Sequence, residues 1–167
     1  MRGAALAVLA IAAASSAGAQ DIVFSEEATR RCLGAAPDSV AQEACIGKSS
    51  DACMAATPAG GTTYGMGGCL DQELSYWDGL LNTYYQTAIE RAKTLDADTR
   101  KYAPEAANME KSLREMQRAW IPFRDASCDF ERAQWTNGTG AGPATLSCLL
   151  EMTGKQALKL GRFGYGS

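Results

Sequence analysis

The sequence predicts an all-α protein: a disulfide-braced helical bundle with two long antiparallel helices, a shorter C-terminal helix and short N-terminal helices. Apolar residues recur at spacings of three and four over two long segments, which is typical of helices packed on one face. Six cysteines follow a leader typical of exported proteins. No segment of convincing length alternates between apolar and polar residues, as a β-strand does.

The leader comprises residues 1–19. Arg2 precedes an apolar run from Ala4 to Ala14, and Ala17-Gly18-Ala19 forms a small-x-small site for signal peptidase. We therefore predict a signal peptide, a mature chain that begins at Gln20, and a periplasmic or secreted location. No cysteine lies at the cleavage point and no later segment reaches the ~20 apolar residues of a membrane span, so we expect no membrane anchor.

The mature chain is mildly acidic. The full sequence has a net charge of −3, and loss of Arg2 with the leader makes it −4. A nucleic-acid partner requires a basic face, so this balance argues against one.

Residues 20–57 form a cysteine-rich section of short helices. Ser25, Ser39, and Ser49 or Ser50 each precede a short helical stretch, since serine is a favoured N-cap. Such helices are too short to be stable alone, so we expect disulfides or packing against a longer helix to hold them.

The second section, residues 58–161, begins with a glycine-rich loop, Pro58–Gly68, from which the next helix starts as early as Thr62 or Thr63. The periodic pattern then predicts a long helix from about Cys69 to Leu95. Its apolar stripe consists of Leu70, Leu74, Trp77, Leu81, Tyr84, Tyr85, Ala88, Ala92 and Leu95.

A second long helix is predicted from Pro104 to about Trp135. Pro122 interrupts it, so we expect a kink near Arg118 or a break there. Its stripe consists of Met109, Leu113, Met116, Trp120, Phe123, Ser127 and Phe130. After a flexible loop, Thr136–Pro143, a shorter helix runs from Ala144 to about Leu160, and Gly161 is expected to end it.

Six cysteines in an exported chain indicate three disulfides, which allow fifteen connectivities. Neighbour pairing is the simplest expectation: Cys32–Cys45, Cys53–Cys69 and Cys128–Cys148. The second and third of these bonds would close the two glycine-rich loops.

Four polar residues lie beside the apolar stripes of the long helices. Asp78 and Asn82 are one turn apart on the first, and Arg124 and Asp125 are adjacent on the second. An acid–base pair of Asp78 and Asp125, as in glycosidases, is one interpretation. The favoured one is a structural polar clasp in which Asp78 or Asn82 meets Arg124, because buried charges persist mainly when paired.

Other features give little support to catalysis. The chain has no histidine, and its cysteine spacing fits no zinc pattern, so we predict no metal, no cofactor and no catalytic residue. An enzyme that uses Asp78, Asp125 or Glu131 lacks a nucleophile with an adjacent base. The glycine run Asn137–Gly142 follows a helix and lacks dinucleotide-binding spacing, so it is interpreted as a loop.

The aromatic residues allow two interpretations. A sugar-stacking platform is one, but at helical spacing aromatic side chains more often belong to the core, which is the favoured interpretation. The residues concerned are Trp77, Tyr84, Tyr85, Trp120, Phe123 and Trp135.

Two sequence elements resemble the LprI-like lysozyme inhibitor family of bacterial envelope domains, over about Cys53 to Leu160. An acid–x–x–Leu–Asn–x–x–Tyr element is matched by Asp78, Leu81, Asn82 and Tyr85. A Gln-x-x-Trp-x-x-Phe-Arg-Asp-x-x-Cys element is matched by Gln117, Trp120, Phe123, Arg124, Asp125 and Cys128. The chain departs from the family in its missing lipobox, in the added Cys32 and Cys45, and in Lys155 and Lys159 near its end.

The resemblance implies a small helical, disulfide-bonded envelope domain that in some members is associated with inhibition of lysozyme. We therefore predict an exported binding protein, not an enzyme, whose partner is a lysozyme-type hydrolase. Its contact loops would be Pro58–Gly68 or Asn137–Gly142, and the acidic chain would be steered to a basic lysozyme. The alternative is a structural or interaction module for another cell-envelope protein.

Overall fold

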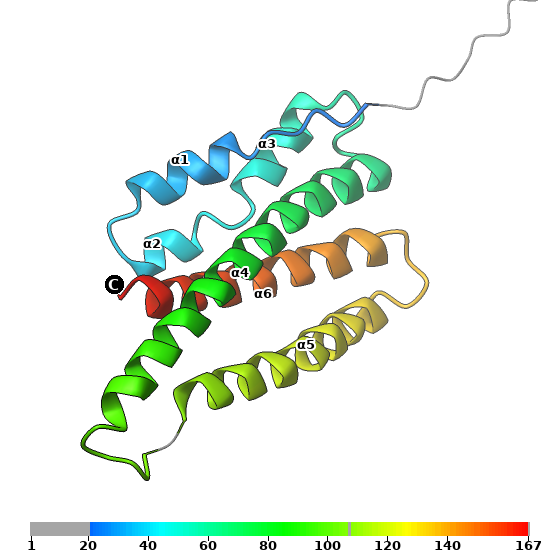
Figure 1. Cartoon of the computed structure of the whole chain (residues 1–167). Helices are drawn as coiled ribbons and strands as arrows, with labels where there is room; N and C mark the ends of the chain where they lie inside the picture. The colour runs from blue at the N-terminus through cyan, green and yellow to red at the C-terminus, as the bar shows by residue number, and fades with distance from the viewer. Residues whose placement is uncertain (1–20, 107, 167) are drawn as a thin grey trace, which may run out of the picture.

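The computed structural model describes residues 21–106 and 108–166, so the predicted signal peptide lies outside the described residues. These residues form helices and no strand, which confirms the all-α class. The helices are α1 (Glu27–Ala35), α2 (Ser39–Glu43), α3 (Lys48–Ala56), α4 (Thr63–Thr99), α5 (Met109–Gln134) and α6 (Ala141–Tyr165) (Figure 1).

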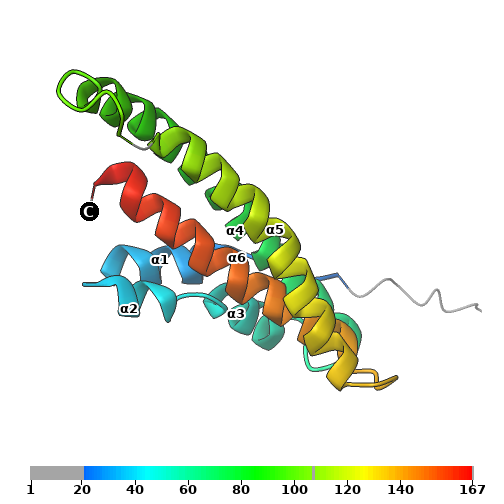
Figure 2. The same ribbon diagram turned by 90° about the horizontal axis from the view of Figure 1, so that it is seen from below.

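The three short helices lie on one side of α4 and α6, and α5 lies on the other (Figures 1 and 2). Local signals explain their starts. Asp38 caps α2 by accepting a hydrogen bond from the Ala41 amide at 2.8 Å. Gly47 precedes α3 with a φ of 95°, a left-handed conformation that favours glycine.

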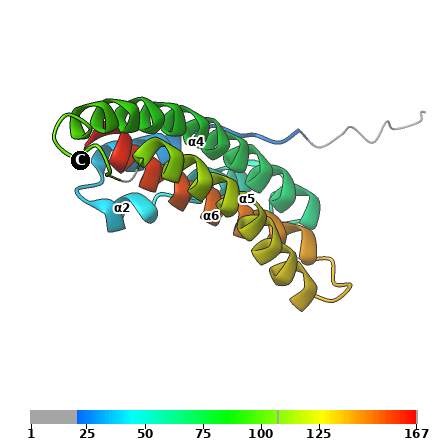
Figure 3. The same ribbon diagram turned by 60° about the horizontal axis from the view of Figure 1, so that its bottom comes forward.

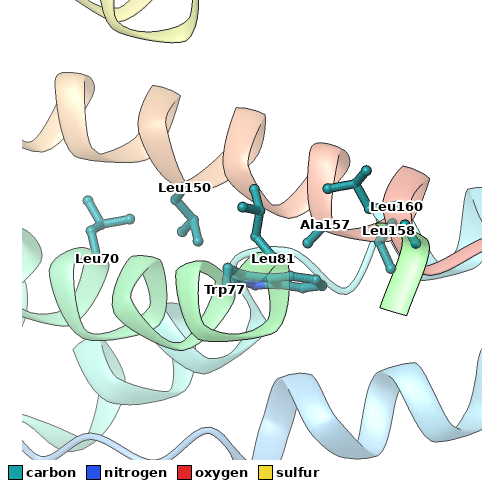
Figure 4. Packing of buried hydrophobic residues seen from close by; sticks show 8 residues of the cluster. Leu70, Trp77, Leu81, Leu150, Ala157, Leu158 and Leu160 are labelled. Carbon is teal, nitrogen blue, oxygen red and sulfur yellow. The ribbon is translucent and has the colours of Figure 1, made fainter. Parts of the chain in front are cut away.

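The hydrophobic core lies mainly between α4 and α6, which run in the same direction, while α5 runs antiparallel to both along the outer side (Figure 3). Figure 4 shows the apolar side chains of the two helices meeting between them. The buried cluster consists of Leu70, Trp77, Leu81 and Ala88 of α4 with Leu150, Ala157, Leu158 and Leu160 of α6. The C-terminal helix is therefore the main packing partner of α4.

The C-terminal helix is longer than predicted, because it continues past Gly161 to Tyr165. The prediction that Gly161 ends it was wrong. Glycine at this end allows close contact with α4: a Cβ added at Gly164 would lie 3.2 Å from the backbone nitrogen of Ala88. The helix ends at Gly166 instead, which has a φ of 77°.

The connection between α4 and α5 also differs from the prediction. Helix α4 continues to Thr99 and α5 starts at Met109, not at Pro104. Two acceptors cap the start of α5: Asn108 accepts from the Lys111 amide at 2.7 Å, and buried Asp96 of α4 accepts from the Met109 amide at 2.8 Å. The first turn of α5 is therefore held by the preceding helix.

Pro122 does not break α5, which is continuous from Met109 to Gln134. The proline removes one backbone hydrogen bond, the one to the carbonyl group of Arg118. Both residues lie on the exposed side of the helix, where the carbonyl group is open to solvent.

Three disulfides join the helices with the neighbour pairing that we expected. They link Cys32 with Cys45, Cys53 with Cys69 and Cys128 with Cys148. The first ties α1 to the segment after α2, the second ties α3 to α4, and the third ties α5 to α6. In the chain-entropy model a loop of this size adds about 3 kcal/mol per bond.

Candidate binding groove

An open groove of about 670 Å³ lies at the end of the bundle where α4 and α6 begin. Its walls come from the end of α2, from α3, from the start of α4, from the α5–α6 loop, and from α6 as far as Lys155. Both predicted contact loops reach this end of the molecule (Figure 1). Met66, from the Pro58–Gly68 segment, and Gly140, from the Asn137–Gly142 segment, line the groove.

The groove combines an apolar floor with an acidic rim. The apolar lining consists of Ile46, Met54, Met66, Leu70, Trp135, Pro143, Ala144 and Leu150. The charged lining consists of Glu43, Asp51, Glu151 and Lys155, so three carboxylates face one ammonium group. Such a lining suits an aliphatic chain that ends in a positive charge.

The single cation of the rim is already paired. Lys155 donates to Glu151 at 2.5 Å. The hydrogen bond from Lys155 to Glu151, their mutual attraction and the more distant charge of Glu43 raise the pKa of Lys155. The ammonium group therefore stays charged at neutral pH, and Glu43 and Asp51 remain for a cationic ligand.

The α5–α6 loop is ordered by local packing. The ring of Trp135 lies against Gly140, where an added Cβ would come within 2.4 Å of the indole. Trp135 also donates to Glu131 at 3.4 Å, and its side chain is still 46% exposed. The disulfide between Cys128 and Cys148 closes this loop, so the groove wall is held in place before any ligand binds.

A buried glutamate supports the opposite wall. Glu73 of α4 is fully buried and accepts hydrogen bonds from two backbone amides of that wall, Gly47 at 3.0 Å and Ser50 at 2.6 Å. It also accepts from the Thr29 hydroxyl at 2.7 Å and the Trp77 indole at 3.1 Å. The Glu73 carboxylate is thus satisfied by four hydrogen-bond donors and not by a basic side chain. These bonds join the short helices α1 and α3 to α4.

The predicted polar clasp is not joined by direct bonds between the helices. Asp78, Asn82 and Arg124 line one recess of about 250 Å³ between α4 and α5. Asn82 donates to Asp78 within α4 at 3.4 Å, and Arg124 pairs with Asp125 within α5 at 2.7 Å. Among the described hydrogen bonds and ion pairs none joins Asp78 or Asn82 to Arg124, and each of these groups bonds to a partner on its own helix.

Four of the five apolar and amide residues matched to the family also meet at this recess: Leu81, Tyr85, Gln117 and Trp120. Gln117 is buried and accepts a hydrogen bond from Gln156 of α6 at 2.8 Å. The Arg124 guanidinium lies over the Trp120 ring, 5.1 Å from its centroid. The fifth, Phe123, points away and is 63% exposed.

The core interpretation of the aromatic residues holds for some of them only. Trp77 is fully buried, and Tyr84, Tyr85 and Trp120 are partly buried against the core. Phe123 and Trp135 are exposed, so for these two the interpretation was wrong. Their helical spacing could not show which side of α5 faces the bundle.

Sequence reasoning missed most of the groove. Glu43, Asp51, Met54, Glu151 and Lys155 come from α2, α3 and α6, and no spacing connects these helices. It also missed Glu73, whose place inside the apolar stripe of α4 (Leu70, Leu74, Trp77) was the available signal. A metal site would need at least three His, Cys, Asp or Glu side chains close together. The described part of the chain contains no such cluster. No helix described here has the length and hydropathy to cross a membrane.

The fold and the disulfides define a small, disulfide-braced helical domain of the extracytoplasmic class, with an open groove at one end. The chain belongs to the family described as lysozyme inhibitor LprI, whose model matches residues 53–160. That match confirms the resemblance of the two long segments and includes the N-terminal turns of α4 and α6 that line the groove.

Two relatives extend the similarity. An uncharacterized 17.7 kDa protein from the puhA 5′ region of Rhodobacter capsulatus is 30% identical over 137 residues, which cover 79% of this chain and 82% of the relative. An uncharacterized protein of Rhizobium meliloti (strain 1021) is 27% identical over 92 residues, 55% of this chain and 66% of the relative. No solved structure matches.

Proposed function

We propose that this protein is an exported, periplasmic or secreted, inhibitor that binds a lysozyme-type hydrolase at the acidic groove. The observation that carries the proposal is the groove itself: an apolar floor and three carboxylates between two disulfide-closed loops. Membership in the lysozyme inhibitor LprI family supports the choice of target. The neighbour-paired disulfides support a location outside the cytoplasm.

The chemistry of the groove suits a basic enzyme surface. A lysine or arginine of the enzyme would lay its aliphatic stem along Met54 and Met66 and place its charge near Glu43 and Asp51. The acidic chain would increase the rate of encounter with a basic partner. Exposed Trp135 would add aromatic contact area at the rim. Inhibition then follows from coverage of the hydrolase, and no catalytic group is required of this chain.

The test is a turbidity assay of bacterial cell-wall lysis with purified protein and lysozymes of several classes. We expect slower lysis at micromolar excess. The variant Glu43→Lys/Asp51→Lys should weaken inhibition by at least about tenfold at low salt, because it reverses the charge of the rim. The matched control is Glu90→Lys/Asp98→Lys, which makes the same charge change on the exposed far part of α4.

Two results would count against the proposal in different ways. Unchanged lysis by every lysozyme class would reject the inhibitor function. If the groove variant and the control variant weaken inhibition equally, the groove is rejected as the contact surface. In the first case, a pull-down from periplasmic extract that recovers another envelope protein would support the alternative interaction module.

A further inference from the structure

The outer side of α5 carries an uncharged seam that covers nothing in the bundle. It consists of Ala119, Phe123, Ala126, Phe130 and Ala133, all of which are exposed. Phe123 is 63% and Phe130 is 70% exposed, although both belong to the apolar stripe that the sequence places toward the core. We call these five residues the outer seam.

Two tethers explain why the outer seam faces away from the bundle. Gln117 is held by the hydrogen bond from Gln156 of α6, and Cys128 by its disulfide to Cys148 of α6. These are the buried residues of α5, and they lie on one side of the helix, about 120° to 160° around the axis from the two phenylalanines at ~100° per residue. The rotation of α5 is thereby fixed with the outer seam in solvent.

The seam has the spacing of a helix–helix contact. Its residues follow one another at intervals of four, three, four and three, the a/d pattern of a coiled coil. Alanine and phenylalanine alternate along it, so each large side chain is flanked by small ones. Such a surface is complementary to a copy of itself when large residues face small ones.

We propose that two copies of this chain pair through the outer seam with their α5 helices antiparallel. A two-fold axis between Arg124 and Asp125 sets Phe123 opposite the partner copy's Ala126, and Phe130 opposite its Ala119. In a parallel pair each residue would face its own copy, so Phe123 would meet Phe123 and the small residues would leave gaps. Only the antiparallel register fills the seam.

The charges beside the seam support the same register. Arg118 and Asp129 are spaced symmetrically about a midpoint in the sequence, and Glu115 and Arg132 share the same midpoint. This midpoint lies within one residue of the proposed two-fold axis. The antiparallel pair therefore places each arginine near an acid of the other copy. Within the described residues Arg118, Asp129 and Arg132 form no ion pair, so they are available for these contacts.

The contact is short, so the dimer should be weak and reversible. From Ala119 to Ala133 the seam spans about 21 Å of helix, which places the interface at the small end of the range for specific association. Most of the groove lining comes from α2, α3, α4 and α6, and Trp135 is the residue of the lining that adjoins α5. The proposal does not depend on lysozyme inhibition.

Sedimentation velocity of the purified exported chain, from low micromolar to several hundred micromolar, tests the pairing. We expect a monomer–dimer equilibrium that Ala126→Glu weakens at least about tenfold, because it buries an unpaired charge at the seam. Ala97→Glu, on an exposed position of α4, is the matched control and should dimerise normally. Circular dichroism of both variants checks that each is folded.

The orientation is tested by electron–electron distance measurement with a spin label at Gln134→Cys. The antiparallel register separates the two labels by about 28 Å along the helices, while a parallel pair brings them within about 10 Å. A chain that stays monomeric at every concentration, a dimer that Ala126→Glu leaves intact, or a short label distance would each overturn the proposal.

Discussion

Trp77 donates its indole N–H to the carboxylate of Glu73, one helical turn earlier on α4, at 3.1 Å, and both side chains are fully buried. The same carboxylate oxygen accepts from the Thr29 hydroxyl and the Gly47 amide, and the other accepts from the Ser50 amide. A single acid in an apolar stripe thus joins two of the short helices, α1 and α3, to the long one.

We predict that Glu73→Gln destabilises the fold by about 2–3 kcal/mol. The amide group replaces one acceptor oxygen with a donor, so at least one of the four buried donors loses its partner. Urea unfolding at neutral pH measures the loss. Asp71→Asn, an exposed change two residues away, should stay within ~0.5 kcal/mol of the wild type. Equal stability of both variants would show that the Glu73 network contributes little.

The acid sensitivity of the α4–α5 connection should depend on Asp96. Its carboxylate accepts from the Glu110 amide at 3.0 Å and from the Met109 amide at 2.8 Å, and these two bonds lower its pKa below the ordinary value. Its contribution to stability is complete above the unfolded-state pKa of about 3.9, and it is lost as the pH falls through the lower native pKa.

We therefore expect the stability difference between the wild type and Asp96→Asn to be constant near neutral pH and to shrink below about pH 4. Urea titrations at a series of pH values measure it. Asp98→Asn removes an exposed acid that pairs with Lys101, and should produce no such pH dependence. A difference that stays constant down to the lowest pH would contradict the assigned role of Asp96.

Contact between α4 and α6 should depend on glycine at position 164. A methyl group there would lie 3.2 Å from the Ala88 nitrogen and 3.3 Å from Thr87 Cγ2, so Gly164→Ala should cost about 1–3 kcal/mol. Gly79, also inside a helix, has nothing within 4 Å of an added Cβ. Gly79→Ala should therefore stabilise the protein by about 0.5–1 kcal/mol. Thermal unfolding compares the two, and stabilisation by both would argue against close packing at Gly164.

The disulfide between Cys128 and Cys148 should matter for the groove as well as for stability. Cys128→Ser/Cys148→Ser should lose about 3 kcal/mol in the chain-entropy model and loosen the loop that carries Trp135. Trypsin cleavage after Arg132, followed by mass spectrometry, should become faster. Cys32→Ser/Cys45→Ser opens a loop outside the α5–α6 connection, so comparable cleavage at Arg132 in both variants would show that the effect is only global.

The helices and their ends could be predicted from the sequence where local signals decide them. The stripes of α4 and α5 recur at helical spacing, and Thr62 caps α4 where a start was expected, with its hydroxyl accepting from the Gly65 amide at 3.1 Å. The boundaries failed where a distant residue decides: Asp96 sets the start of α5, and contact with α4 carries α6 past Gly161.

The sequence by itself determined the all-α class and the family, because helical periodicity and the two motif elements are properties of the chain. Neighbour pairing of the cysteines was one of fifteen connectivities until the structure placed each pair together. Tertiary structure alone decided which faces meet. Periodicity defines a stripe but not its rotation, so only the tethers at Gln117 and Cys128 turn Phe123 and Phe130 outward. The groove likewise exists only after α2, α3 and α6 come together, because its acidic rim is drawn from helices far apart in the chain.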